Sequence, residues 1–208
     1  MQQGFNKIGI FGGTFNPIHC GHLIIAETVR EKLSLDKVLF IPSGQPPHKP
    51  DDEVIDPEYR FEMVSRAVAS NRFFEASDIE IKRVGYTYTI HTLQTLREEY
   101  GLEAELFFIV GADVIPELIT WKDFRNVFKL CEFAAVLRPG HDKKVFTAEI
   151  EQLKREYNIK VHMIKAPLID ISSSSIREKC SSGKSIKYLV TEGTEEYIDK
   201  EHLYRQAP

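Results

Sequence analysis

Strand and helix signals alternate from one end of this chain to the other, and this alternation constrains the fold more than any other feature. Apolar runs, several of which stop at Gly or Pro, indicate strands at 8–11, 38–41, 73–82, 106–110, 133–137 and 159–164. Apolar residues at helical spacing indicate helices at 21–33, 56–70, 89–100, 115–121 and 147–157, with further helices from 173. Such alternation predicts an α/β fold whose parallel sheet is covered by helices on both faces.

The length of 208 residues fits one domain, and we expect 1–208 to form it, with 173–208 as its C-terminal helical part. Asp56 before Pro57 is typical of a helix start, and Gly101 of a helix end in a left-handed conformation. Ligands of open parallel sheets bind beyond the carboxyl ends of the strands. The first candidates for chemistry are therefore the loops after Phe11, Ile41, Val110 and Ile164.

Composition excludes several classes of protein. The net charge of −4 argues against broad nucleic-acid binding, which needs a basic surface. The three cysteines lack CxxC spacing, which suits a reducing cytoplasm better than a disulfide framework. No apolar run reaches the roughly 18 residues of a membrane span, so we expect a cytoplasmic protein without a membrane partner.

The segment 12–22 reads GGTFNPIHCGH and joins the first expected strand to the first long helix. Its paired glycines allow a sharp turn and a close approach to a ligand. His19 and His22 share one face of the first helical turn, where backbone N–H groups attract anions. The same histidines are also explained as polar caps or surface residues, or, with Cys20, as part of a zinc site for which no fourth ligand has suitable spacing.

The segment 171–178 reads ISSSSIRE and follows the last expected strand. Serines are strong N-cap residues, and Ser175 with Glu178 has capping-box spacing, so one interpretation is a well-capped helix or a flexible serine loop. Arg177 then places positive charge at the unfavourable end of the helix dipole. A nearby anion would explain that arginine.

Both segments resemble motifs of the nucleotidyltransferase superfamily: 12–22 its H-x-G-H signature, and 171–177 its I-S-S-T-x-I-R motif, with Ser174 in place of the usual Thr. The resemblance implies a Rossmann-like, doubly wound parallel sheet with a small C-terminal helical extension. The residues that it makes catalytic, by holding the phosphates of ATP, are His19, His22 and Arg177. The residues that it assigns to ATP binding are Gly12, Gly13, Thr14, Phe15, His22, Gly111, Asp113, Ile171, Ser174 and Arg177.

Four further segments are similar to the bacterial nicotinate mononucleotide adenylyltransferases, a likeness that covers nearly the whole chain: 46–49 (PPHK), 85–93 (GYTYTIHTL), 108–113 (FIVGAD) and 138–140 (RPG). The acceptor-binding residues implied are Lys49, Tyr88, Thr89, Trp121 and Arg138. The indole of Trp121 can stack on a pyridine ring, although a partly buried core tryptophan is an equal interpretation of this residue. N–H groups at a helix start would receive a carboxylate better than a neutral carboxamide, which favours nicotinate over nicotinamide. His91 departs from the family, which carries Asp there.

The reaction implied joins ATP to nicotinate mononucleotide and gives nicotinate adenine dinucleotide (deamido-NAD) and pyrophosphate in NAD biosynthesis. Mg²⁺ would accompany ATP on its β- and γ-phosphates, without a metal site of the protein's own. The acceptor phosphate is largely ionised near neutral pH, so alignment and charge neutralisation would drive the reaction. Small-molecule substrates are the expected partners, and a homo-oligomer stays open. Alternatives are nicotinamide mononucleotide or pantetheine phosphate as acceptor, and a non-catalytic nucleotide-binding module; the missing G-x-G-x-x-G disfavours an oxidoreductase.

Overall fold

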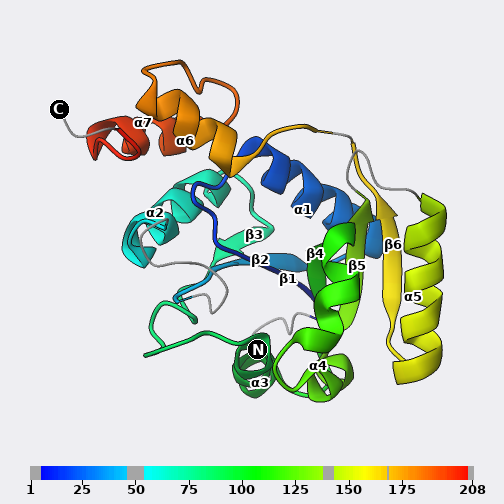
Figure 1. Ribbon diagram of the computed structural model, residues 1–208. Helices are drawn as coiled ribbons and strands as arrows, with labels where there is room; N and C mark the ends of the chain where they lie inside the picture. Colours follow the sequence, from blue (N-terminus) through cyan, green and yellow to red (C-terminus); the bar gives the residue numbers. More distant parts are fainter. Residues whose placement is uncertain (1–5, 46–53, 138–142, 168, 206–208) are drawn as a thin grey trace.

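The computed structural model describes residues 6–45, 54–137, 143–167 and 169–205, without the side chains at 112–113 and 143–146 (Figure 1). Over these ranges the strands are β1 (Lys7–Gly13), β2 (Lys37–Pro42), β3 (Phe74–Ala76), β4 (Glu105–Gly111), β5 (Glu132–Leu137) and β6 (Val161–Lys165). The helices are α1 (Cys20–Leu33), α2 (Pro57–Val68), α3 (Thr89–Tyr100), the 3₁₀ helix η2 (Ala112–Thr120), α4 (Phe124–Leu130), α5 (Lys143–Tyr157), α6 (Ser173–Ser181) and α7 (Glu192–Lys200).

The strands pair in parallel in the order β3-β2-β1-β4-β5-β6. The order reverses between β1 and β4, because β2 follows β1 on one side and β5 follows β4 on the other. This is the doubly wound arrangement, and it confirms the predicted fold class. Ligands of such sheets bind beyond the carboxyl ends of the strands at the reversal, which here are the ends of β1 and β4.

Each face of the sheet is buried by its own set of helices (Figure 1). Alternate strand residues point to opposite faces, so Leu39 joins the cluster under α3, η2, α4 and α5, while Phe40 joins the cluster under α1, α2, α6 and α7. The C-terminal helices contribute Ile176 and Ile198 to that second cluster. The extent of a single domain over 1–208 stays a prediction.

Local signals predicted most helix ends correctly. Helix α3 has the expected bounds, and Gly101 after it has a φ of 83°. Asp56 caps α2 by accepting a hydrogen bond from the backbone N–H of Glu58 at 2.8 Å. Neither signal depends on distant parts of the chain.

Three local expectations were wrong. The strand predicted over 73–82 ends at Ala76, because Lys82 donates its backbone N–H to Asp78 in a local turn and so leaves the sheet. The cap of α6 is Ser172, whose Oγ accepts from the N–H of Ser175 at 3.1 Å, so the expected capping box at Ser175 lies inside the helix. Helix α4 was not predicted, since it has only seven residues and two of them are phenylalanines of modest helix propensity.

Candidate active site

The two histidines of the H-x-G-H segment face each other at the start of α1. His19 is the N-cap in extended conformation, and its backbone N–H donates to Nδ1 of His22 at 3.2 Å. The two imidazole rings are stacked, with centroids 3.6 Å apart. Because Nδ1 of His22 accepts a hydrogen bond, the proton of the neutral ring belongs on Nε2. The arrangement thus makes His22 a donor on the atom opposite its backbone contact.

The surroundings hold both rings in place. A Cβ built on Gly21 would lie 3.0 Å from Nδ1 of His19, so the ring of His19 packs directly over this glycine. Phe11 and Phe15 present their ring edges to His22 at centroid distances of 5.9 and 5.1 Å. His19 itself is buried, with 8% of its surface exposed. The glycine between the histidines therefore lets the ring of His19 lie closer to the helix backbone than a larger residue would allow.

Helix α6 and the C-terminal residues contact the loop between β1 and α1 through side-chain hydrogen bonds. Nη1 of Arg177 donates to the carbonyl of Asn16 at 2.8 Å, and Oγ of Ser173 donates to the carbonyl of Pro17 at 2.8 Å. The hydroxyl of Tyr204 donates to Oδ1 of Asn16, also at 2.8 Å. Arg177 therefore lies at the H-x-G-H loop, although the hydrogen-bonded residues are 156 and 161 positions apart in the sequence. Arg177 thus contacts the loop of the histidines through the carbonyl of Asn16.

A cavity of about 380 Å³ opens between these two segments. Its polar lining includes His19, His22, Asp170, Ser172 and Ser173. Its apolar lining comes from α1, from the ends of β5 and β6 and from the segment before α6: Ile25, Val136, Leu137, Ala166, Pro167, Ile169 and Ile171. Apolar walls with a few polar groups at one side are typical of sites for small organic ligands.

Five other predicted ATP-binding residues divide into three groups. Gly12 and Gly13 end β1, and a Cβ on Gly12 would lie 3.2 Å from Cζ of Phe108, so this glycine allows β1 to lie against that ring. Gly111 ends β4, beside β1, but the side chain of Asp113 lies outside the described residues. Ser174 is exposed on α6, whereas Ser172 and Ser173 line the cavity. The three groups stay predictions as ligands.

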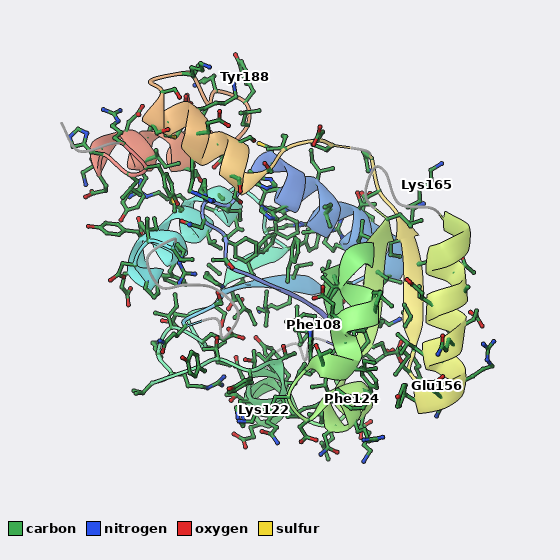
Figure 2. The ribbon with its side chains drawn as sticks, in the orientation of Figure 1. Phe108, Lys122, Phe124, Glu156, Lys165 and Tyr188 are labelled. Atoms are coloured by element: carbon green, nitrogen blue, oxygen red, sulfur yellow. The ribbon has the colours of Figure 1, made fainter. Side chains whose placement is uncertain are left out.

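Of the predicted acceptor residues, Tyr88, Thr89 and Trp121 lie on the α3 and α4 side of the sheet. Tyr88 is the N-cap of α3, and Nζ of Lys122 lies 4.1 Å from the centre of its ring. Trp121 is half-buried and meets Phe108 edge-to-face at a centroid distance of 5.6 Å, so its core-packing interpretation is observed. Figure 2 shows Phe108 at the sheet and Lys122 beside α3. Two further predicted residues, Lys49 and Arg138, lie outside the described part of the chain.

Sequence reasoning missed Asn16, Arg60 and Tyr204, which hold the loop after β1. Asn16 stands inside the recognised motif, but nothing near Tyr204 in the sequence marks it as a partner of that motif. For Cys20 as a zinc ligand, the described residues offer no group of three or more His, Cys, Asp or Glu side chains placed to hold a metal ion. No helix among the described residues has the length and apolar character to cross a membrane.

Comparisons with known proteins point to the same family as the two motifs. A family model described as cytidylyltransferase-like matches residues 10–179. A protein of Moorella thermoacetica named probable nicotinate-nucleotide adenylyltransferase is 47% identical over 199 residues, 96% of this chain and 92% of that protein. One of the same name from a Thermoanaerobacter species is 44% identical over 96% of this chain and 95% of its own length. The solved nicotinic acid mononucleotide adenylyltransferase of Plasmodium falciparum, complexed with NaAD, shares the fold, with a TM-score of 0.77 and 19% identity over 96% and 97% of the two chains.

Proposed function

This chain belongs to the cytidylyltransferase-like family, and from that premise we propose that it transfers the adenylyl group of ATP to nicotinate mononucleotide, forming nicotinate adenine dinucleotide and pyrophosphate in NAD biosynthesis. The observation that carries this proposal is the shared cavity of the two motifs, lined by His19 and His22 from one and by Ser172 and Ser173 from the other. Relatives named probable nicotinate-nucleotide adenylyltransferase match this chain over nearly its full length.

We propose that the cavity and the start of α1 bind different parts of ATP. The apolar walls of the cavity suit the flat adenine base, and the polar side suits the phosphates. Backbone N–H groups at the start of α1 add partial positive charge there. Nε2 of His22, the ring of His19 and the guanidinium of Arg177 stabilise the negative charge that grows on the α-phosphate and on pyrophosphate.

The transfer itself needs little from a general base. The acceptor phosphate is largely ionised near neutral pH, because the second pKa of a phosphate monoester is about 6. Its oxygen attacks the α-phosphorus in line while the bond to pyrophosphate breaks, and no covalent enzyme intermediate is required. The residues act by alignment and charge neutralisation, as is usual for transfers at phosphorus.

Mg²⁺ is proposed to enter with ATP, whose β- and γ-phosphate oxygens are its preferred kind of ligand. The carboxylate of Asp170, which lines the cavity, is an oxygen donor of the type that this ion accepts. The ion would supply charge neutralisation on pyrophosphate. We also propose a cytoplasmic protein whose partners are its small-molecule substrates.

Turnover of a His22→Ala variant tests the assignment of the histidine pair. Loss of one such donor lowers kcat by about 10²–10³-fold, so pyrophosphate release with ATP, Mg²⁺ and nicotinate mononucleotide should nearly vanish. Circular dichroism should show an intact fold. His202→Ala is the control, because His202 is exposed after α7 and should keep parental turnover. Near-parental turnover in His22→Ala would remove the proposed role.

Acceptor choice is tested by comparing kcat/KM for the nicotinate and nicotinamide mononucleotides. The N–H groups at Tyr88 and Thr89, at the start of α3, are proposed to receive the carboxylate, with Trp121 against the ring and with Lys49 and Arg138 at the phosphate or ribose. We expect the nicotinate form to be preferred. A preference for the amide would overturn this part of the proposal and leave adenylyl transfer standing.

A further inference from the structure

Arg60 is the largest fully buried side chain among the described residues, with 1% of its surface exposed. Its guanidinium donates to three backbone carbonyls: Nη1 to Thr14 at 2.8 Å, Nη2 to Gly44 at 3.0 Å and Nε to Ile55 at 3.0 Å. A single side chain of α2 thus binds three loop segments. The planar fork of five donors makes arginine suited to this, whereas lysine offers one compact ammonium.

Stability alone does not account for a cation at this position. Burial lowers the pKa of Arg60, which means that the charge is held against a desolvation cost. Asp56 and Glu80 attract the guanidinium, but its three hydrogen bonds are to neutral carbonyls. Neutral donors could satisfy these carbonyls without that desolvation cost, whereas a single arginine fork reaches all three segments at once. The arrangement therefore favours a role in geometry.

Two of the three carbonyls belong to loops that directly follow two adjacent strands, β1 and β2. Thr14 follows β1 in the H-x-G-H segment, and Gly44 follows β2. In a trans peptide the N–H is directed opposite the carbonyl, so the bond to Thr14 turns the N–H of Phe15 away from Arg60. A Cβ on Gly44 would clash with the backbone carbonyl oxygen of Glu80, so that loop is enclosed on a second side as well.

The contact at Gly44 continues to the acceptor side. Gln45 forms a parallel bridge with Tyr86, and the carbonyl of Gln45 accepts from the N–H of Thr87 at 3.1 Å. Thr87 directly precedes Tyr88, the N-cap of α3. Arg60 is thereby connected to the loop of the histidines in one direction and to the proposed nicotinate segment in the other.

We propose that Arg60 is a positioning residue for adenylyl transfer. It holds the loop of the histidines after β1 and the segment 43–45 after β2, which contacts the start of α3, in one fixed relation. The inference rests on the proposed function, because it names a residue that acts on both substrate sites without touching either. A displacement of about 1 Å between reacting groups costs on the order of 10²-fold in rate. A defect at Arg60 should therefore reduce turnover far more than the stability change alone would explain.

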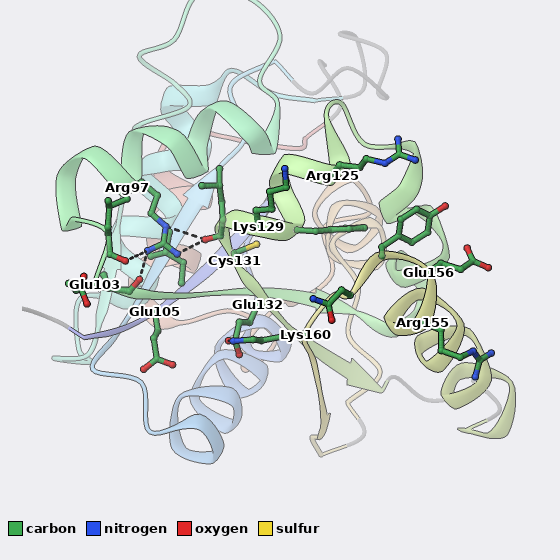
Figure 3. A pocket seen from close by; sticks show the side chains of 17 residues that line it. Arg97, Glu103, Glu105, Arg125, Lys129, Cys131, Glu132, Arg155, Glu156 and Lys160 are labelled. Atoms are coloured by element: carbon green, nitrogen blue, oxygen red, sulfur yellow. Dashed lines mark hydrogen bonds and ion pairs between the residues drawn. The ribbon is translucent and has the colours of Figure 1, made fainter.

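The chain contains a matched control in Arg97 of α3. Its guanidinium also donates to backbone carbonyls, those of Leu102, Ala104 and Leu130 (Figure 3). These lie around the amino-terminal ends of β4 and β5, whereas ligands bind beyond the carboxyl ends. Arg97→Lys thus removes the same kind of interaction away from the proposed site.

The test compares Arg60→Lys, Arg97→Lys and the parent protein in melting temperature, in steady-state kinetics for both substrates and in amide hydrogen exchange. Both variants should lose stability. Arg60→Lys should lose about 10²-fold in kcat/KM for ATP and for nicotinate mononucleotide, with faster exchange at residues 14–18 and 43–45. Arg97→Lys should keep kcat/KM within about threefold and show unchanged exchange in those two segments, as expected for a site away from the reacting groups.

Near-parental kcat/KM in Arg60→Lys, or an equal loss in Arg97→Lys, overturns the proposal. A parent protein that releases no pyrophosphate with these substrates refutes the proposed function instead. In that case the exchange comparison still decides whether Arg60 holds the two loops: unchanged exchange at 14–18 and 43–45 in Arg60→Lys overturns the inference, and faster exchange confined to that variant supports the holding role.

Discussion

Replacing Gly21 with alanine should separate activity from stability. The added Cβ would lie 3.0 Å from Nδ1 and 3.1 Å from Cε1 of His19. Ordinary contacts between such atoms are about 3.5 Å or longer, so the imidazole has to move by about 0.5 Å. The ring of His22 is stacked on that of His19 with centroids 3.6 Å apart, so a displacement of His19 also disturbs His22.

The substitution should lower turnover and raise stability, and the size of each change can be estimated. A misplacement of about 1 Å costs on the order of 10²-fold in rate, so half of that should lower kcat by about tenfold. The backbone at Gly21 is helical, and alanine is the better helix former by up to about 1 kcal/mol. For a chain of this size, that gain raises the melting temperature by about 2–4 °C at most. We therefore expect a protein that is equally or more stable and yet slower.

The assay measures pyrophosphate release at saturating substrates together with thermal unfolding. Gly193→Ala is the control, because Gly193 is the second residue of α7 as Gly21 is of α1, and its added Cβ would meet Cβ of Arg66 at an ordinary 3.5 Å. It should share the gain in stability and keep parental turnover. Unchanged kcat in Gly21→Ala, or a loss of activity that merely follows a loss of stability, would refute the reasoning.

Two more predictions concern side chains outside the cavity, Tyr204 and Glu80. Tyr204→Phe removes the hydrogen bond to Asn16 and should lower the free energy of unfolding by about 1 kcal/mol, measured by denaturant unfolding beside the exposed control Tyr59→Phe; equal stability of the two variants would contradict it. Burial raises the pKa of the Glu80 carboxyl, so the folded state holds its proton more tightly than the unfolded chain does, and the contribution of this group is present below the unfolded pKa and is lost as pH rises. The stability of Glu80→Gln relative to the parent should therefore improve from about pH 4 to about pH 7, and a decline over that interval would contradict the assigned pKa direction.

Features that depend on neighbours in sequence could be predicted. The bounds of α3 and the cap at Asp56 follow from apolar spacing and local hydrogen bonds. The parallel sheet follows from the alternation of strands and helices. The motif at 12–22 was recognisable because its residues lie together in the sequence, and the structure places its histidines at a helix start beside a cavity.

Features that depend on distant contacts could not be predicted. The end of β3 at Ala76 and the cap at Ser172 are set by local hydrogen bonds, but at each place the sequence offered a second local pattern that the folded chain does not use. The sequence marked Ser174 as the hydroxyl of the second motif, while the cavity is lined by its two neighbours on the amino-terminal side. Side-chain direction on a helix start depends on where the cap falls, and a shift of three residues changes which hydroxyls face the site.

The sequence by itself determined the fold class, the two motifs and the order of elements apart from α4, because periodicity and capping act over a few residues. Only the tertiary structure decided what holds those motifs together: Arg60, Arg177 and Tyr204 reach Thr14 and Asn16 across 46 to 188 residues of chain. Such hydrogen bonds leave no periodic trace in the sequence, since they depend on how packed helices bring their ends to one loop. The reacting residues thus lie in short motifs that can be recognised in the sequence, whereas the contacts that hold these motifs together exist only in the folded protein.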